Sequence, residues 1–472
     1  MKNQKKFRYS LNSKAFIVGA VIIVLLLNAI LISLNDKIAL EIDFTEDKIY
    51  ALADESKEIA GQIDEPTEIL ILTSGVDNEI LSMVKNVLGN FGQHNSKITI
   101  REVNVVKEPA AVQAYAKELE TLSQFSLIIR QSDRYEIVNS QDYFSQNGFS
   151  YIERLVTTKL ATFVDGIHNA TILFTKGHGE QVSEGNVGIL EMTGYEVGQI
   201  DTLTEDFPAA EDSVVIISCP QVDFSVEEID KLDAYLDLGG NVQIYFDPVY
   251  CSTELPNLVN YLSEDWGLIR NTDIVWDMSQ MIENSNYMLA QMSDHEITAP
   301  VYDSQKRVGY GPANSIGRAP EKPANVTIHT LLKSYDSAYA KADIQTAISQ
   351  GSMEKASGDA EGPFDVLVAA SRENENVAGE LHVGHLVVSG SALIFDALTA
   401  DTRFANEDIL LNSISWMQGG ESSITVRAKM LPGGSMSVSK TQFWTWLVIL
   451  VVVVPLAILV AGILVFVKRR YK

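Results

Sequence analysis

The sequence predicts an α/β fold flanked by two transmembrane helices, and three observations predict it. Two apolar runs without a charged residue, Ala15 to Leu34 and Phe443 to Val467, lie near the ends of the 472-residue chain. Between them, short apolar segments of strand length alternate with segments of helical periodicity. Hydrophobic residues make up 46% and charged residues 21% of the chain, which is typical of globular proteins and excludes wholesale disorder.

Each apolar run is long enough to cross a hydrocarbon core of about 30 Å as a helix. Residues 1–14 contain bases but no acid, and the same is true of residues 468–472. The positive-inside rule then predicts a cell-membrane protein with both termini in the cytoplasm and residues 35–440 outside it. The alternative for residues 15–34 is a cleavable signal peptide. We expect an uncleaved anchor, because the run is longer than the apolar stretch of a typical signal peptide and no A-x-A-like cleavage site follows it.

The net charge of the chain is −26, from 36 bases and 62 acids. Nine of the bases lie at the two predicted cytoplasmic ends, so the predicted outer region has 27 bases, 62 acids and a net charge of −35. Such acidity argues against nucleic acid as a partner, since nucleic-acid binders need a basic face. No Gly-x-x-x-x-Gly-Lys-Ser/Thr motif occurs, so the chain does not hydrolyse ATP through a P-loop.

The first outer region, residues 37–150, predicts a thioredoxin-like domain. Its expected order is β-α-β-α-β-β after a short helix that begins at Asp54, with strands and helices at 67–73, 78–91, 97–106, 109–122, 126–130 and 135–138. No Cys-x-x-Cys motif is present, which excludes dithiol redox chemistry whatever the fold.

The second outer region, residues 151–430, predicts a mostly parallel, doubly wound sheet after a helical connector at 151–165. The expected strands and helices are 171–174, 184–193, 195–201, 214–218, 225–238, 241–246, 365–370, 386–389, 406–417 and 423–429. Residues 277–362 are richer in Ser, Asn, Gln, Gly and Pro, and we expect an insertion with weak strands and mobile loops there.

One motif of possible chemistry follows the first strand of this region. In doubly wound sheets ligands bind outside the carboxyl ends of strands, where glycines permit close approach and polar side chains hydrogen-bond or titrate. A plain strand-to-helix turn is the simpler interpretation, with glycines at positive φ. The ligand-binding candidates are Gly177, His178, Gly179, Glu180 and, at the end of a neighbouring strand, Asp247. No catalytic residue, metal ligand or cofactor is predicted.

The two cysteines, Cys219 and Cys251, allow three interpretations. We favour separate buried cysteines. A disulfide is the next alternative, which an extracytoplasmic location permits. A nucleophile is the least favoured, because Cys219 lacks a glycine-flanked elbow and Pro220 follows it directly.

Two further polar patterns predict no site. Ser389-Gly390-Ser391 lacks Gly-x-Ser-x-Gly and predicts a strand-end turn. His382 and His385 would face opposite sides of a strand, which argues against a metal pair.

The order of several segments resembles the GldG-type auxiliary proteins of ABC transport systems, a family associated with gliding motility in some bacteria. The matching segments are Phe44 to Leu52, which looks like the family's post-membrane segment, Thr175 to Glu180, which looks like its TGHGE turn, Pro220 to Ser225 with Glu227 to Gly240, Arg403 to Asp408 with Asn412 to Trp416, Arg427, and the basic tail. The sequence departs from the family at Lys176 and in the long insertion 277–362.

The resemblance implies a thioredoxin-like domain followed by a domain like a class I glutamine amidotransferase without its catalytic cysteine. It also implies a partner permease and a separate cytoplasmic ATPase. We therefore expect a membrane-anchored, non-enzymatic auxiliary subunit of an ABC transport system, whose outer domains bind substrate or partner proteins. The alternatives are an anchored hydrolase or amidotransferase-like enzyme that uses His178, Glu180, Asp247 and Cys219, and a surface scaffold or adhesion protein.

Overall fold

The computed structural model describes residues 51–430, except 76–77, 120, 145–147, 165–169, 211–212, 252–253, 283–284, 303–305, 343, 345–346, 348, 350–352, 376–377, 397, 400, 402 and 420–425. The predicted termini 1–14 and 468–472 and the predicted spans 15–34 and 443–467 lie outside the described residues. Within the described part of the chain, no helix has both the length and the apolar composition needed to cross a membrane. All elements below belong to one compact unit that begins at Leu52.

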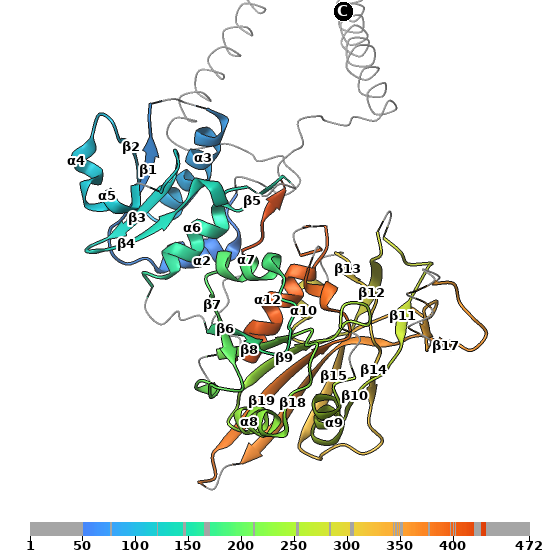
Figure 1. Ribbon diagram of the computed structural model, residues 1–472. Coiled ribbons are helices and arrows are strands. Elements are labelled where there is room, and N and C mark those ends of the chain that lie inside the picture. The colour runs from blue at the N-terminus through green and yellow to red at the C-terminus, as the bar shows by residue number, and fades with distance from the viewer. Residues whose placement is uncertain are drawn as a thin grey trace, which may run out of the picture. The chain divides into compact units, whose positions relative to one another are not determined.

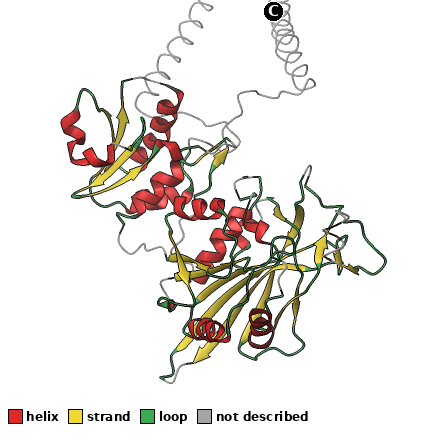
Figure 2. Cartoon of the chain, viewed as in Figure 1, coloured by secondary structure: helices red, strands yellow, loops and turns green. Residues whose placement is uncertain are grey.

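The fold is mixed α/β, as the sequence predicts (Figures 1 and 2). A first sheet has the order β2-β1-β3-β4. Strands β1 and β2 are parallel, and β3 is antiparallel to both β1 and β4. The bounds are β1 (Thr67–Thr73), β2 (Ile98–Asn104), β3 (Leu127–Gln131) and β4 (Arg134–Val138). This confirms the predicted succession of two strands with a helix between them, then a hairpin.

The helices of this region are α2 (Asp54–Gln62), α3 (Glu79–His94), α4 (Pro109–Val112), a 3-10 helix (Gln113–Tyr115), α5 (Ala116–Leu119) and α6 (Ile152–Ala161). Helix α3 begins where the Asn78 side chain accepts a hydrogen bond from the amide of Leu81. Its apolar face, spaced three or four residues apart, is buried. The single helix expected over 109–122 is instead three short pieces.

The second sheet has nine strands in the order β13-β12-β15-β18-β19-β9-β8-β6-β7. Strands β7, β6, β8, β9 and β19 form a parallel half, and the remaining four add antiparallel. The bounds are β6 (Thr171–Lys176), β7 (Glu196–Asp201), β8 (Ser213–Ser218), β9 (Asn241–Tyr245), β12 (Met288–Met292), β13 (Val308–Tyr310), β15 (Val326–Lys333), β18 (Asp365–Glu375) and β19 (Leu381–Ser389). The expectation of a mostly parallel sheet therefore holds for only one half.

Helices cover both faces of the parallel half, as doubly wound packing requires (Figure 1). Side chains of β8 alternate between the faces: Val214 and Ile216 join one core, and Val215 and Ile217 join the other. The first core includes residues of α7 (Glu184–Met192) and α12 (Asn406–Met417). The second includes residues of α8 (Val226–Asp237) and α9 (Pro256–Asp265).

Residues 277–362 contribute more to the sheet than their composition predicts. Strands β12, β13 and β15 extend the nine-stranded sheet, and Leu331 and Leu332 are fully buried in β15. The other small elements here and beside them are β10 (Leu268–Arg270), β11 (Ile274–Trp276), α10 (Ala299–Tyr302), β14 (Ile316–Arg318), β16 (Tyr339–Lys341) and β17 (Ala360–Glu361). The description as an insertion of weak strands thus misses three strands of the main sheet.

Charged side chains join α6, α12 and residues 427–429, the last of which begins β20 (Lys429–Met430), the strand that pairs with β5 (Phe149–Ser150). Arg154, with 1% of its side chain exposed, forms an ion pair of 2.6 Å with Glu407. Lys429 pairs with Glu153, and Arg427 pairs with Asp408. The last two pairs anchor the segment that leads toward residues 443–467.

Candidate functional site

Four of the five predicted ligand-binding residues, Gly177 to Glu180, lie at the point where the strand order of the parallel half reverses, whereas Asp247 follows β9, one strand further along the sheet. From β6 the chain passes to β7 on one side, and then to β8 on the other side of β6. Such a switch point is the usual ligand-binding position of an open α/β sheet. The loop after β6 carries Gly177 to Glu180, and the loop after β8 carries Cys219 to Val222.

His178 occupies this position and is almost completely buried. Its Nδ1 lies 3.2 Å from Oε1 of Glu180, and its Nε2 lies 3.1 Å from Oε1 of Glu228. The imidazole stacks on the ring of Phe224, with 3.9 Å between the ring centroids. Both ring nitrogens thus have carboxylate partners from this chain. We call this arrangement of His178, Glu180, Glu228 and Phe224 the histidine clasp.

Glu228 contacts residues of three loops around the histidine clasp. It is the third residue of α8, and it completes a capping box with Ser225. Its carboxylate also accepts a hydrogen bond of 2.5 Å from the hydroxyl of Thr202, which follows β7. Loops after β6, β7 and β8 therefore meet at one buried carboxylate.

The electrostatics of the histidine clasp favour the charged forms of His178, Glu180 and Glu228. Burial alone would lower the pKa of His178, but the two carboxylates outweigh it and raise that pKa above its ordinary value of 6.5. Burial alone would raise the pKa of Glu180 and Glu228. Hydrogen bonds, from His178 to Glu180 and from Thr202 and Ser225 to Glu228, instead lower both below 4.5.

The main chain of the same loop is also engaged. The carbonyl of His178 accepts hydrogen bonds from the amides of Gln221 and Val222, at 2.7 and 2.9 Å. Gly179 has a φ of +71°, and a Cβ added there would lie 3.2 Å from Cβ of Gln221. The loop therefore packs against the neighbouring loop, and the turn interpretation accounts for its glycines.

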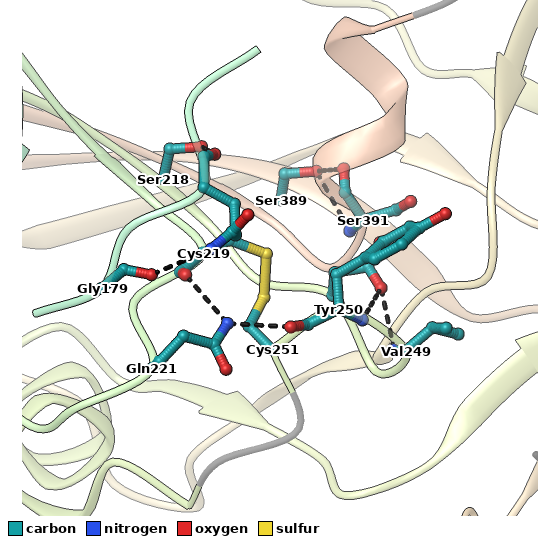
Figure 3. The surroundings of a disulfide bond; sticks show 11 residues. Gly179, Ser218, Cys219, Gln221, Val249, Tyr250, Cys251, Ser389 and Ser391 are labelled. Atoms are coloured by element: carbon teal, nitrogen blue, oxygen red, sulfur yellow. Dashed lines mark hydrogen bonds between the residues drawn. A yellow bond between two sulfur atoms is a disulfide. The ribbon is translucent and has the colours of Figure 1, made fainter.

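Cys219 and Cys251 form a disulfide, so the preference for separate buried cysteines is wrong (Figure 3). The reason is topological: β8 and β9 are adjacent and parallel, so the loops that follow them end at the same edge. The two Cα atoms lie 5.4 Å apart, within disulfide reach. Neither sulfur is available as a thiolate nucleophile in this state.

Further contacts connect the loops at this edge (Figure 3). The Gln221 side-chain amide donates to the carbonyl of Tyr250 at 2.8 Å. The amide of Phe246 donates to the carbonyl of Ser389 at 2.8 Å. Ser389 and Ser391 are fully buried and hydrogen-bonded to each other, in the strand-end turn that the sequence predicts.

Asp247 is fully buried in the loop after β9. Its Oδ1 accepts hydrogen bonds from the amides of Val249 and Tyr250, at 2.8 and 2.9 Å. Burial raises its pKa to about 6, although these two hydrogen bonds oppose the increase. Its visible role is to fold the loop that carries Tyr250 and Cys251.

A pocket of about 600 Å3 lies beside this loop. Its lining includes Tyr250, Trp276, Met278, Met281 and Met353, together with the carboxylate-bearing Glu354. We call it the edge pocket. The sequence does not predict this pocket, because its lining residues come from segments more than a hundred positions apart. The exposed methionines after β11 are the one local signal that points to it.

A second group that the sequence did not predict gathers around Trp416 of α12. The ring of His385 lies 4.3 Å and that of His295 lies 5.3 Å from the Trp416 ring, and His329 lies 5.1 Å from His295. Burial lowers the pKa of His385 to about 4, so it is neutral at physiological pH. Over residues 51–430 as described, no group of three His, Cys, Asp or Glu side chains has a geometry that holds a metal ion.

No family model matches the chain, and no curated protein matches it. Among solved structures, the mmIFT52 N-terminal domain is similar, with 15% identity, a TM-score of 0.38, and coverage of 53% of this chain and 99% of that domain. A ThuA-like protein from Bacteroides uniformis shows 11% identity, a TM-score of 0.30, and coverage of 54% and 93%. A ThuA-like protein from Parabacteroides merdae shows 13% identity and a TM-score of 0.29, and the match covers 55% of this chain and 92% of that protein.

Proposed function

We propose that this chain is a membrane-anchored, non-catalytic auxiliary subunit of an ABC transport system. Its outer domains would bind substrate or partner proteins, and its two anchors would pack beside a permease served by a cytoplasmic ATPase. The proposal includes both termini in the cytoplasm and residues 35–440 outside. It rests first on the sequence resemblance to GldG-type auxiliary proteins.

The observation that carries the non-catalytic part is the histidine clasp. The usual ligand position of the nine-stranded sheet is filled by His178, and both of its ring nitrogens face carboxylates of the same chain. The nearby Cys219 is bonded to Cys251. A nucleophile needs a free thiol or hydroxyl beside an accessible base. Cys219 has no free thiol in the disulfide, and the buried His178 is not an accessible base.

Two further features support the proposal. The sheet order β2-β1-β3-β4, with its last two strands antiparallel, fits the thioredoxin-like domain, and the parallel half with helices on both faces fits the amidotransferase-like domain. A disulfide fits an oxidising compartment outside the cytoplasm.

Affinity purification of the tagged full chain from native membranes in mild detergent tests this proposal. We expect a multi-span permease and an ATPase to be recovered together with the chain. An unrelated tagged membrane protein of similar abundance is the control. Recovery of the chain alone, under conditions that preserve other membrane complexes, would contradict it.

A further inference from the structure

Exposed apolar side chains lie on the loops at the carboxyl edge of the parallel half and on the loop after β11, which lines the edge pocket together with Val249 and Tyr250. Of the thirteen large hydrophobic residues that are exposed in the described part of the chain, seven lie in loops or at a helix start just after β7, β8, β9 or β11. They are Leu203, Val222, Val226, Val249, Tyr250, Met278 and Met281. We call these seven residues the carboxyl-edge surface.

Hydrogen bonds and the shared edge pocket connect the loops that carry the carboxyl-edge surface. Thr202, next to Leu203, bonds to Glu228, whose capping box with Ser225 begins the helix that starts at Val226. Gln221, next to Val222, donates to the carbonyl of Tyr250. Tyr250 in turn lines the edge pocket with Met278 and Met281. The apolar residues thus lie on loops that are held together and end at a concave pocket.

The rim of this surface is acidic. Around Leu203, Val222 and Val226, the described residues 201–210 and 221–231 include four exposed acids, Glu205, Asp206, Glu227 and Asp230, and one base, Lys231. The one base of that stretch is already paired with Asp206. The edge pocket adds the exposed Glu354. A partner that covers apolar side chains within such a rim needs apolar anchors flanked by positive charge.

We infer that the carboxyl-edge surface is a protein-docking surface, which takes a partner segment whose apolar side chain enters the edge pocket and whose flanking Lys or Arg residues face the acidic rim. The inference rests on the proposed function, in which the partner is the outward-facing part of the permease. Tyr250 is the central anchor, because it is 60% exposed on a loop fixed by the disulfide and by Asp247. Large aromatic anchors of this kind dominate protein interfaces.

Site-specific photo-crosslinking in the native host tests the inference on the full-length chain. A benzophenone side chain replaces Leu203 or Tyr250 at the carboxyl edge. Leu238 and Leu381 are matched controls, because they are equally exposed but lie at the opposite edge, just before β9 and at the start of β19. Adducts are identified by mass spectrometry.

The expected result is a permease adduct, at a segment with Lys or Arg, from positions 203 and 250 and at least tenfold less from 238 and 381. Adducts to a second copy of this chain or to lipid alone, or equal permease adducts from both edges, would overturn the docking surface.

A second variant separates this inference from the proposed function. Tyr250→Ser with Leu203→Ser should lower the recovery of the permease at least fivefold, whereas Leu238→Ser with Leu381→Ser should leave it unchanged. Undiminished recovery with the first pair would overturn the docking surface while the proposed function stands. If the unaltered chain recovers no permease, the proposed function itself fails.

Discussion

At the scale of single residues, the main feature is an imidazole whose hydrogen-bonding groups are all used within the chain. The sequence could place His178 after a strand, but it could not show whether the ring faces solvent. The deciding partner, Glu228, lies fifty positions away, and the stacking residue, Phe224, has the spacing of an ordinary core residue. The local sequence pattern therefore predicts the turn, whereas only the tertiary contacts show that the His178 ring occupies the usual ligand position.

Replacing the imidazole should destabilise the protein. His178→Ala leaves two buried carboxylates facing an empty position, and we expect it to lower the free energy of unfolding by about 3 kcal/mol. Urea denaturation of the full chain in detergent measures this. His94→Ala, which removes an exposed histidine, is the control and should change the stability far less. Equal stability of His178→Ala and the unaltered chain would mean that the carboxylates are not buried as described.

The stabilisation from the histidine clasp should depend on pH. The pKa of His178 is raised above 6.5, so its contribution is complete below about pH 6.5 and is lost as pH rises through the raised value. The pKa values of Glu180 and Glu228 are lowered, so their contribution is complete above about pH 4.5 and is lost as pH falls through the lowered values.

The stability difference between the unaltered chain and His178→Gln should therefore be largest between about pH 4.5 and 6.5. The difference should shrink by pH 9, because His178 loses its charge as pH rises whereas the glutamine of the variant is neutral at every pH. Denaturation of both proteins across this range measures the difference. A difference that grows steadily toward alkaline pH would contradict the direction assigned to His178.

At the scale of elements, the sequence predicts the helices and strands whose signal is local. The amphipathic helix over 406–417 and the buried strand over 67–73 are confirmed with the same bounds as α12 and β1. The elements it missed depend on distant partners. β10, β11 and β16 are three residues long, too short for a periodic signal, and β15 gains its place by pairing with β18. The same limit applies to the disulfide and the edge pocket.

The disulfide between the loops after β8 and β9 should stabilise these elements. It closes a loop of 32 residues, which corresponds to about 4 kcal/mol from the lower entropy of the unfolded chain. We expect Cys219→Ala with Cys251→Ala to lower the stability of the full chain by this order in urea denaturation.

A reductant provides the control for the cysteine variant. It should lower the stability of the unaltered chain toward that of the variant and leave the variant unchanged. If the unaltered chain and the variant unfold at the same urea concentration without reductant, the two cysteines are not bonded to each other in the native protein.

At the scale of the whole molecule, charge separates the predicted compartments. The chain has a net charge of −26, which divides into nine bases at the two ends and −35 between them. The acidic rim of the carboxyl-edge surface belongs to that outer part. At the other end of the described chain, the Arg427–Asp408 and Lys429–Glu153 pairs hold the segment that continues toward the second apolar run. If the chain is anchored at both ends, as we propose, its acidic outer part would suit a partner that is also fixed in the membrane.

The most direct test of the auxiliary role is a reciprocal purification through the ATPase. The ATPase is expected on the cytoplasmic side, whereas most of this chain is expected outside, so their joint recovery requires a complex that spans the membrane. We predict that a tagged ATPase, purified from native membranes in mild detergent, brings down both the permease and the intact full-length chain. Recovery of the permease without this chain would contradict the account.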